Sequence, residues 1–588
     1  MSGLKKVARK KSASARKPSK SPDATVNRAG GVSFEVKDPA LKLITMTGGS
    51  FFAEPRFYNA DQCVPKRIVG GQLSKLVERL AIVDNKLSGF ASCEELNEVA
   101  REVVATAVDV AKGKNPEDIL AIANWLRNDM NIRLTPQVLM VLASKIDGSK
   151  TLVRKYAPHI VKRPDEIKTC LLVHRFLFGM KPLSNSLACG LSDALSKFGE
   201  RGLMKYDDSG FPKWKDVLNW LPRKAGWPLK TEVAEYFRTG KIMDPMKTPV
   251  IFYRTELNKK TAFDSEAKEL ACKSFVNWEV LLSQFGGEKH NVWTFLIEND
   301  LVGYMALLRN LRNILEAKVS RTVIQKVSDK LSNRDEVLRS KQLPFRFLSA
   351  VKSIEEMTGS ADRADMSELM ASVELACNES VANIPVLPGT TVIFADMSGS
   401  MSSNKVSEKS TVTCKDVASV LCGIVAKAAH RPYVVGFGTD VAPVTFSKVD
   451  TVIGVSKKVQ GVDTKGYNTN GYRCMEWLME NKLVPDRVIF LSDMQMWNNG
   501  RDASNGKSLA DVWDLYLKSA PGAKKTWVHC VHLSGYGDTP LVGDHVNQVA
   551  GFSEKIFTNL LTVEGLSGIE SIPTLDQIRE KWTVTQKV

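Results

Sequence analysis

Apolar side chains between about residues 70 and 360 recur every three or four positions, which is the spacing of one face of an α-helix. Two segments show this pattern most clearly, 71–83 and 93–108. The apolar residues that would form the two faces are Leu73, Leu76, Val77 and Leu80 in the first segment and Leu96, Val99, Val103 and Val104 in the second. The pattern predicts a helical module over this part of the chain.

Helix start signals are frequent in the same region. Residues 115–118 place a capping Asn, a first-turn Pro and two acids before an apolar run. Similar starts occur at Thr135-Pro136 and at Pro164-Asp165-Glu166. The predicted helices are short and broken by Gly, Pro and Asn. A long series of such helices is typical of stacked helix pairs in a solenoid or ring, although no repeat of fixed length is visible.

After about residue 384 the pattern changes. Strand-like apolar runs such as 391–395 and 487–491 now alternate with amphipathic segments such as 414–429 and 509–519. This alternation predicts a parallel sheet with helices on both faces. In such folds ligands bind beyond the carboxyl ends of the strands, so we expect the functional residues there.

The composition is that of an ordinary soluble globular protein, with 43% apolar and 25% charged residues. A chain of 588 residues should form more than one folded unit. No run of about 18 apolar residues predicts a membrane span, and the basic N-terminus lacks the apolar core of a signal peptide. Ten cysteines without a Cys-x-x-Cys pair indicate reduced thiols and an intracellular protein. We interpret His529-Cys530-Val531-His532 as buried strand residues rather than a zinc site.

The net charge of +16 is unevenly distributed. Residues 1–31 carry +8 and predict a disordered basic tail, either an arm that increases affinity for phosphates or a solubilising or targeting extension. Residues 32–384, the predicted helical-repeat module, carry +7, and residues 385–588, the predicted α/β domain, carry +1. The charge therefore directs attention to the tail and the helical module.

Basic residues are concentrated at 306–350. Arg309 and Arg312 lie three positions apart and are predicted to share a helix face, and Arg346 follows in the same segment. A cationic stripe of this kind suits the phosphate backbone of nucleic acid, whereas the alternative is a solvated helix face.

The most specific chemistry lies at two predicted strand ends. The motif D-x-S-x-S places Asp396, Ser398 and Ser400 in one turn, and Asp493 ends a second strand in the same way. Thr469, which directly precedes a helix, can supply a third hydroxyl, although Thr464 lies nearby. Carboxylate and hydroxyl oxygens suit Mg²⁺ or Mn²⁺ rather than zinc. The sequence therefore predicts a divalent-metal site.

An enzyme is not indicated. Residues 500–508 look like a phosphate-binding loop, but the first Gly is one residue too far upstream. No acid pair or Ser/His/Asp set has a sequence context typical of catalysis.

The metal motifs resemble those of the von Willebrand factor A domain and its metal-ion-dependent adhesion site. Asp396, Ser398 and Ser400 fit the first motif of that site, Thr469 the second and Asp493 the third. The resemblance covers about 200 residues and implies a doubly wound α/β fold.

A helical module followed by such a domain resembles the Ro 60 kDa autoantigen family, whose helical part is called the TROVE module. The segments that carry the resemblance are 304–311, which contains A-L-L-R-N-L, 343–348, which begins L-P-F, 551–553, and Lys205-Tyr206 with Lys213, Lys215 and Asp216. The resemblance implies a helical-repeat (HEAT-like) ring, a monomer closed by the A domain. It also implies binding of small structured Y RNAs, capture of single-stranded 3′ ends of misfolded RNAs, and a 3′ exonuclease partner.

One departure from the family concerns Asp207 and Asp208, where vertebrate relatives are basic. Two acids would repel RNA there, so we expect the structured-RNA surface to be shifted, with Arg223 and Lys224 as further candidates. The residues that we predict to contact RNA are Arg309, Arg312, Arg346, Lys205, Lys213 and Lys215. We expect a cytoplasmic protein of RNA quality control, with nuclear entry as an alternative. The competing hypothesis is a metal-dependent protein-interaction scaffold.

Overall fold

The computed structural model describes most of the chain. The described residues are 24–26, 32–35, 38–47, 98–130, 132–179, 182–207, 211–221, 231–342, 344–405, 411–498, 506–533, 538–543, 545–550, 555–564 and 575–584. The predicted helix at 71–83 and the loop at 551–553 lie outside these ranges.

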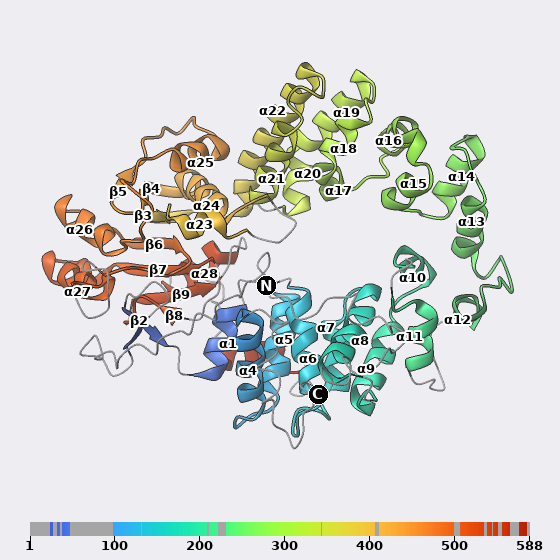
Figure 1. Ribbon diagram of the computed structural model, residues 1–588, viewed down its shortest axis with the longest axis horizontal. Coiled ribbons are helices and arrows are strands. Elements are labelled where there is room, and N and C mark those ends of the chain that lie inside the picture. Colours follow the sequence, from blue (N-terminus) through green and yellow to red (C-terminus); the bar gives the residue numbers. More distant parts are fainter. Residues whose placement is uncertain are drawn as a thin grey trace, which may run out of the picture.

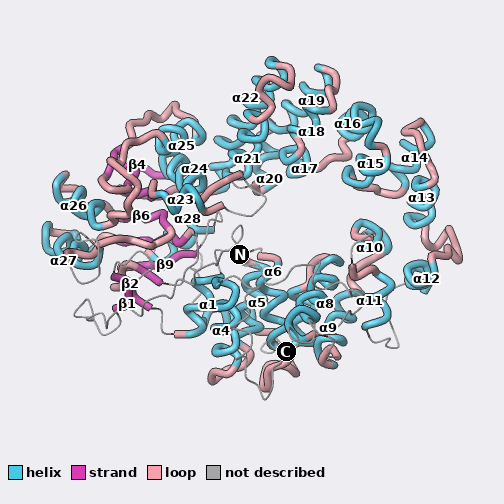
Figure 2. The backbone as a smooth tube through the Cα atoms, viewed as in Figure 1, coloured by secondary structure: helices cyan, strands magenta, loops and turns pink. Residues whose placement is uncertain are grey.

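Helices follow one another through the first part of the chain and then lead into the strand-containing domain (Figure 2). In order they are α1 (Pro39–Thr47), α4 (Glu98–Ala111), α5 (Asp118–Asn128), α6 (Leu134–Ala143), α7 (Val153–Ile160), α8 (Pro164–Phe178), α9 (Asn185–Leu195), α10 (Glu200–Lys205), α11 (Trp214–Trp220), α12 (Thr231–Thr239), α13 (Pro249–Asn258), α14 (Ser265–Lys273), α15 (Trp278–Gln284), α16 (Lys289–Glu298), α17 (Tyr304–Arg309), α18 (Leu311–Glu316), α19 (Arg321–Ser332), α20 (Arg334–Ser340), α21 (Pro344–Glu355) and α22 (Arg363–Ser380). Figure 1 shows them arranged around a ring, with the sheet domain between α22 and α1. The predicted helical ring followed by an α/β domain is confirmed.

Local start signals account for several helix boundaries. α8 begins at Pro164, whose fixed φ suits the first helical position. α5 begins at Asp118, whose Oδ1 accepts a hydrogen bond of 2.9 Å from Asn115 Nδ2. α6 differs from the prediction, because it already begins at Leu134, one residue before the Thr-Pro pair.

The prediction that Arg309 and Arg312 share one helix face is wrong, because the structure has two helices there, separated at Asn310. The Asn310 side chain donates through Nδ2 to the carbonyl oxygen of Ala306 at 2.7 Å, while its backbone N–H bonds Leu307 only three residues back. An amide side chain that binds the backbone in this way competes with continued α-helix. Arg309 therefore ends α17, and Arg312 belongs to α18.

The C-terminal domain is built on a six-stranded sheet with strand order β5-β4-β3-β6-β7-β9. The strands are β3 (Leu387–Asp396), β4 (Ala429–Phe437), β5 (Val441–Pro443), β6 (Arg487–Ser492), β7 (Trp527–His532) and β9 (Val546–Ala550), and the helices are α23 (Gly399–Ser403), α24 (Cys414–Ala428), α25 (Val452–Gln460), α26 (Tyr472–Glu480), α27 (Leu509–Ser519) and α28 (Lys555–Val563). All pairs are parallel except β4–β5. The predicted parallel sheet is therefore confirmed, with one antiparallel strand at its edge.

Successive residues of β3 face opposite sides of the sheet. Val392 and Phe394 pack in one apolar cluster with Trp513 of α27, whereas Ile393 and Ala395 pack in another with Val417 of α24. This alternation is the period of a strand that is covered on both faces. The cluster on the α24 side continues into the helices from α13 to α22, so the ring and the domain share one core there.

Segments near both ends of the chain pack against parts of the protein outside the domains that were predicted to contain them. β1 (Ala24–Val26) pairs with β2 (Val32–Glu35), which pairs with β8 (Asp538–Thr539) of the C-terminal part. The prediction of disorder throughout 1–31 is therefore wrong for Ala24–Val26, since backbone hydrogen bonds to β2 order a segment that has little apolar surface of its own. α29 (Leu575–Trp582) lies in the segment assigned to the α/β domain but packs on α5. Its Ile578 is fully buried in the core of the first helices.

Among the described residues, no helix is both long enough and apolar enough to span a membrane.

Candidate metal centre and RNA interface

The predicted metal residues come together at the carboxyl edge of the sheet. β3 and β6 are parallel neighbours with Ala395 opposite Leu491, so Asp396 and Asp493 follow adjacent strands at the same edge. Both carboxylate side chains are buried, at 0% and 2% exposure. Alignment of the strand ends therefore brings together two acids that are 97 residues apart in the sequence.

Hydroxyl and amide groups surround the Asp396 carboxylate. Its Oδ1 accepts a hydrogen bond of 2.9 Å from the Ser398 backbone N–H, and its Oδ2 accepts one of 2.5 Å from Ser492 Oγ. The Oγ atoms of Ser398 and Ser400 share a hydrogen bond of 3.1 Å. Ser492 was missed by the sequence analysis, and its position immediately before Asp493 is the signal that could have found it.

Burial and a neighbouring like charge disfavour ionised Asp396. Burial raises the pKa of Asp396 to about 7, and the adjacent Asp493 adds to this increase. A divalent cation between the two carboxylates would remove both penalties, because it supplies the missing opposite charge. The residues present therefore fit a hard cation held by oxygen atoms.

The hydroxyl of Thr469 is better placed to complete the donor set than that of Thr464. Thr464 Oγ1 donates to the carbonyl oxygen of Gly466 at 2.9 Å, so it serves its own loop. Thr469 is 5% exposed, and its side chain has no hydrogen bond with any residue that the structure describes. Its carbonyl oxygen accepts from the Trp497 N–H at 2.9 Å, which ties this loop to the segment after Asp493. The assignment of Thr469 as a ligand stays a prediction.

The His-Cys-Val-His segment is a buried strand, as predicted. All four residues lie in β7, and His529 Nε2 bonds Glu564 Oε1 at 2.8 Å. Within the described ranges, no cluster of three or more His, Cys, Asp or Glu side chains could hold a metal ion. The predicted site does not depend on such a cluster, because only two of its five ligands are acids.

Two of the predicted RNA contacts, Arg309 and Arg346, lie close together. Burial, and to a smaller extent the charges of Arg309 and Arg133, together lower the pKa of Arg346 to about 10. Arg346 belongs to α21, Arg309 ends α17, and Arg133 immediately precedes α6. Figure 1 shows α6 and α21 on opposite sides of the ring.

The surroundings of these guanidinium groups differ. Asp165 and Glu166 lie near enough to Arg133 to raise its pKa, although burial lowers the pKa of Arg133 overall. Arg133 and Arg309 are exposed, and neither forms an ion pair with a described residue. Sequence analysis missed Arg133, because it lies far from the basic segment 306–350 and joins it only through the closure of the ring.

Arg312 differs from Arg309. Its Nε lies 2.9 Å from Glu316 Oε1, and its Nη1 lies 3.4 Å from Glu356 Oε2. Two carboxylates thus compete with any phosphate for this guanidinium group.

The lysines predicted to contact structured RNA are exposed. Lys205 ends α10, Lys213 precedes α11 and Lys215 lies in its first turn. Asp207, predicted to repel RNA here, lies near enough to Arg254 to raise its pKa, although burial lowers the pKa of Arg254 overall. Asp208, Arg223 and Lys224 lie outside the described residues.

Comparison with known proteins connects both halves of this arrangement. Residues 247–417 match the family described as the TROVE domain, and residues 391–506 match the Ro60 vWA domain. The two matches together cover residues 247–506 and agree with the resemblance to the Ro60 family. The vWA match covers the segment that contains Asp396, Thr469 and Asp493.

More distant similarity extends over about half of the chain. It is 24% identical to telomerase protein component 1 of Mus musculus over 376 residues, 55% of the chain, and 22% identical to that of Rattus norvegicus over 373 residues, 54% of the chain. The matched region spans only 14% of the length of each relative. The crystal structure of the Deinococcus radiodurans RO (RSR) protein superposes with a TM-score of 0.55 and 16% identity, over 86% of this chain and 96% of that one. This likeness establishes the fold.

Proposed function

We propose that this protein binds RNA and takes part in noncoding-RNA metabolism and RNA quality control. Its ligands would be small structured RNAs, bound on the surface of the helical module, and single-stranded 3′ ends of misfolded RNAs, bound inside the ring. The matches to the TROVE domain and to the Ro60 vWA domain support the proposal.

The observation that carries the proposal is the grouping of Arg133, Arg309 and Arg346. Burial is the main cause of the lowered pKa of Arg346, and the positive charges of Arg309 and Arg133 add to it, so phosphate oxygens would be favourable neighbours there. The three groups come from distant segments of the chain. The arrangement favours a ligand that is held by its backbone, as in sequence-tolerant binding of single strands.

The structured-RNA surface would include Lys205, Lys213 and Lys215. All three are exposed and close in sequence to α10 and α11, where they can contact phosphates without restricting RNA sequence. The basic N-terminal segment would increase association with any RNA.

For the A domain we propose a Mg²⁺ or Mn²⁺ ion held by the carboxylates of Asp396 and Asp493 and by the hydroxyls of Ser398, Ser400 and Thr469. When bound, the ion would supply a positive centre for an acidic group of a partner. The chain's own residues hold these oxygens in place through the Ser398 N–H and Ser492 Oγ contacts to Asp396. This donor set supports the second candidate function, a metal-dependent protein scaffold, and a 3′ exonuclease is the kind of partner expected for it.

We further propose that the protein acts as a monomeric, non-enzymatic ring in the cytoplasm, with nuclear entry as the alternative. Crosslinking in cells followed by sequencing of the attached RNA tests the ligand class. We expect structured noncoding RNAs and 3′-extended transcripts with the intact protein, and their depletion with Arg133→Gln/Arg309→Gln. Recovery of no RNA above background would contradict the proposal.

The double variant Asp396→Ala/Ser398→Ala separates the two candidate functions. Loss of protein partners with RNA recovery unchanged would assign capture of partners to the metal site. Loss of RNA recovery as well would instead make the metal site necessary for the ring or for RNA binding.

A further inference from the structure

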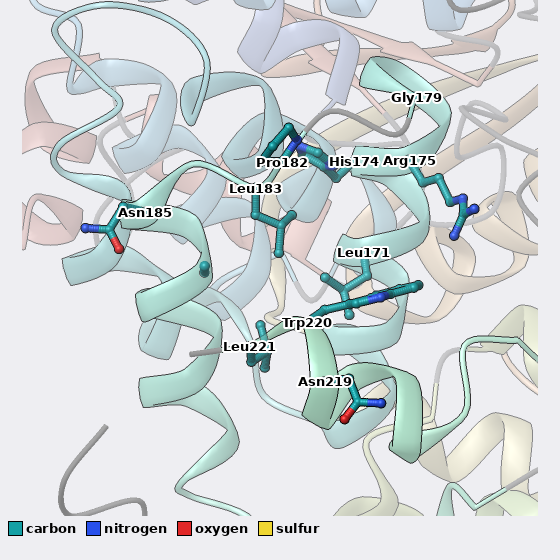
Figure 3. Close-up of a pocket in the computed structure, with 11 residues that line it drawn as sticks. Leu171, His174, Arg175, Gly179, Pro182, Leu183, Asn185, Asn219, Trp220 and Leu221 are labelled. Atoms are coloured by element: carbon teal, nitrogen blue, oxygen red, sulfur yellow. The ribbon is translucent and has the colours of Figure 1, made fainter. Parts of the chain in front are cut away.

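A cavity of about 540 Å³ opens between α8, α9 and α11, away from the arginine group and from the metal site. Figure 3 shows Leu171, Leu183, Trp220 and Leu221 around its centre, with His174 at one end. The size is within the range of pockets that hold small organic groups. Its walls are mostly apolar, with Arg175, Asn185 and Asn219 as polar members, so a flat group with polar edges fits it.

His174 provides one unpartnered polar atom in this wall. His174 is only 3% exposed, and its Nε2 atom has no hydrogen-bond partner among the described residues. Burial and the charge of Lys145 lower the pKa of His174 to about 4, so the imidazole is neutral near pH 7. A neutral imidazole attracts phosphate poorly, but it can donate to or accept from the edge of an uncharged ring.

Aromatic rings and a guanidinium group lie at the mouth of the cavity. Trp220 is 38% exposed, and its ring packs edge-on against Phe211 with centroids 5.7 Å apart. The guanidinium carbon of Arg175 lies 5.4 Å from the Phe211 centroid and 5.8 Å from that of Trp220. A partly exposed Trp face supported in this way is suited to stacking with a planar ligand.

The charged residues around the cavity favour a planar ligand that is part of an anionic polymer. Among the described residues that line it, none is Asp or Glu. Lys213 and Lys215, which we propose to contact RNA phosphates, flank the start of α11, and Trp220 is its last residue. An RNA strand whose phosphates are held by these lysines could therefore place one base near Trp220, since α11, which separates Lys213 from the cavity, is only seven residues long.

We propose that the cavity between α8, α9 and α11 binds one unpaired nucleobase of an RNA, which stacks on Trp220 and hydrogen-bonds His174 Nε2. The inference rests on the proposed RNA-binding function and adds a base subsite to it. The subsite would favour RNAs that present an unpaired base beside a duplex, because the lysines hold the backbone and the cavity holds the base.

The test uses the full-length chain and a fluorescein-labelled hairpin RNA with an unpaired 3′ tail. A series of otherwise identical RNAs carries a single abasic nucleotide at each unpaired position in turn. One position should weaken binding to the wild-type protein about tenfold when it is abasic, within the range measured for loss of one stacked base. Trp220→Ala should bind the intact RNA about tenfold more weakly and should be insensitive to the abasic change at that position.

Phe275→Ala is the matched control. Phe275 is 57% exposed and lies 4.3 Å from the Arg201 guanidinium carbon, but it does not line the cavity. This variant should keep the wild-type response to the abasic series. His174→Gln, which retains hydrogen-bonding ability, should lose less affinity than His174→Leu.

An abasic penalty that is equal in wild type and Trp220→Ala would overturn the base subsite. So would binding of adenosine monophosphate as tight as that of the RNA, because the cavity would then serve a free nucleotide. If the wild-type protein binds none of the RNAs, the proposed function itself fails. Salt-dependent RNA binding without coupling to Trp220 removes the subsite alone.

Discussion

Arg579 binds Asp118 through two parallel hydrogen bonds, although the two residues are 461 positions apart. Arg579 Nε lies 2.8 Å from Asp118 Oδ1, and Nη2 lies 2.7 Å from Oδ2. The pair joins α29 to the first residue of α5, and the hydrogen bond to Asp118 raises the pKa of Arg579. The C-terminal helix thereby fastens the end of the chain to the first helices of the ring.

Replacing Arg579 with Ala should lower the free energy of unfolding by about 2 kcal/mol, because the charged hydrogen bonds to a carboxylate that is only 7% exposed are lost. Arg579→Lys should lose about half as much, since Lys retains the charge but not the paired geometry. Urea unfolding monitored by circular dichroism measures both values. Equal stability of wild type and Arg579→Ala would show that α29 is held without this pair.

Arg309 and Arg312 offer a matched pair for RNA binding. Arg309→Gln should weaken RNA binding and reduce the slope of log affinity against log salt by about 0.7, the value for one phosphate contact in a single strand. Arg312→Gln should change both less, because Glu316 and Glu356 already neutralise its charge. Fluorescence anisotropy across a salt series measures the slopes. A larger effect of Arg312→Gln would place the RNA path on α18 instead.

Magnesium should stabilise the A domain through the Asp396–Asp493 pair. Millimolar Mg²⁺ should raise the melting temperature of the wild-type protein, because binding to the folded state alone shifts the folding equilibrium. Asp493→Asn should melt higher than wild type without metal, since like-charge repulsion with Asp396 is removed, and should no longer respond to Mg²⁺. Asp463→Asn, which removes an exposed acid paired with Lys465, is the control and should keep the response. A response that survives in Asp493→Asn would move the ion elsewhere.

His174 should make the protein less stable in mild acid. Its pKa in the folded state, about 4, is below the ordinary value of 6.5, so the unfolded chain binds the proton first as the pH falls. The contribution of His174 to the free energy of unfolding is constant above about pH 7. By pH 5 the protein has lost about 2 kcal/mol of that free energy. His174→Gln lacks this titration. Between pH 7.5 and pH 5 its free energy of unfolding, measured with urea, should therefore rise relative to that of the wild type by about the same 2 kcal/mol. A difference between the two proteins that does not change with pH would indicate that the pKa of His174 in the folded protein equals its ordinary value.

The buried network around Glu564 should be among the most sensitive positions of the A domain. Glu564 accepts hydrogen bonds from Arg487 Nε and Nη2 at 2.7 and 2.6 Å, and both side chains are at most 2% exposed. Arg487→Met would leave a buried carboxylate without its cation and should cost about 3–5 kcal/mol. Arg154→Ala, at an exposed pair with Asp193, should cost far less stability in the same assay, because solvent screens that pair. Similar losses for the two variants would mean that Glu564 finds another partner.

The residues of the proposed metal site could be chosen from sequence because its motifs are local, a D-x-S-x-S turn after one predicted strand and Asp493 after another. Their meeting depends on β3 and β6 being parallel neighbours. Thr469 was preferred to Thr464 from the sequence because a helix follows it directly, and its role as a ligand stays a prediction.

The grouping of Arg133 with Arg309 and Arg346 was predicted only in part, because it arises from tertiary closure. The segment containing Arg309 and Arg346 is visibly basic, but nothing in the local sequence links Arg133 to it. Ion pairing distinguishes Arg312 from Arg309, and one of its partners, Glu316, is four residues away, whereas the other, Glu356, is 44 residues away. The break at Asn310 and the place of α29 in the first core likewise depend on packing partners that the helical pattern does not contain.

Binding of RNA 3′ ends is tested most directly by comparing the affinity of the full-length protein for two hairpin RNAs. One RNA carries a single-stranded 3′ tail and the other is blunt. We predict tighter, salt-dependent binding of the tailed RNA, and loss of the tail's advantage in Arg133→Gln/Arg309→Gln while that variant retains the wild-type melting temperature. Equal affinity of the wild-type protein for both RNAs, or an advantage of the tail that persists in the variant, would contradict binding of RNA ends at the arginine group.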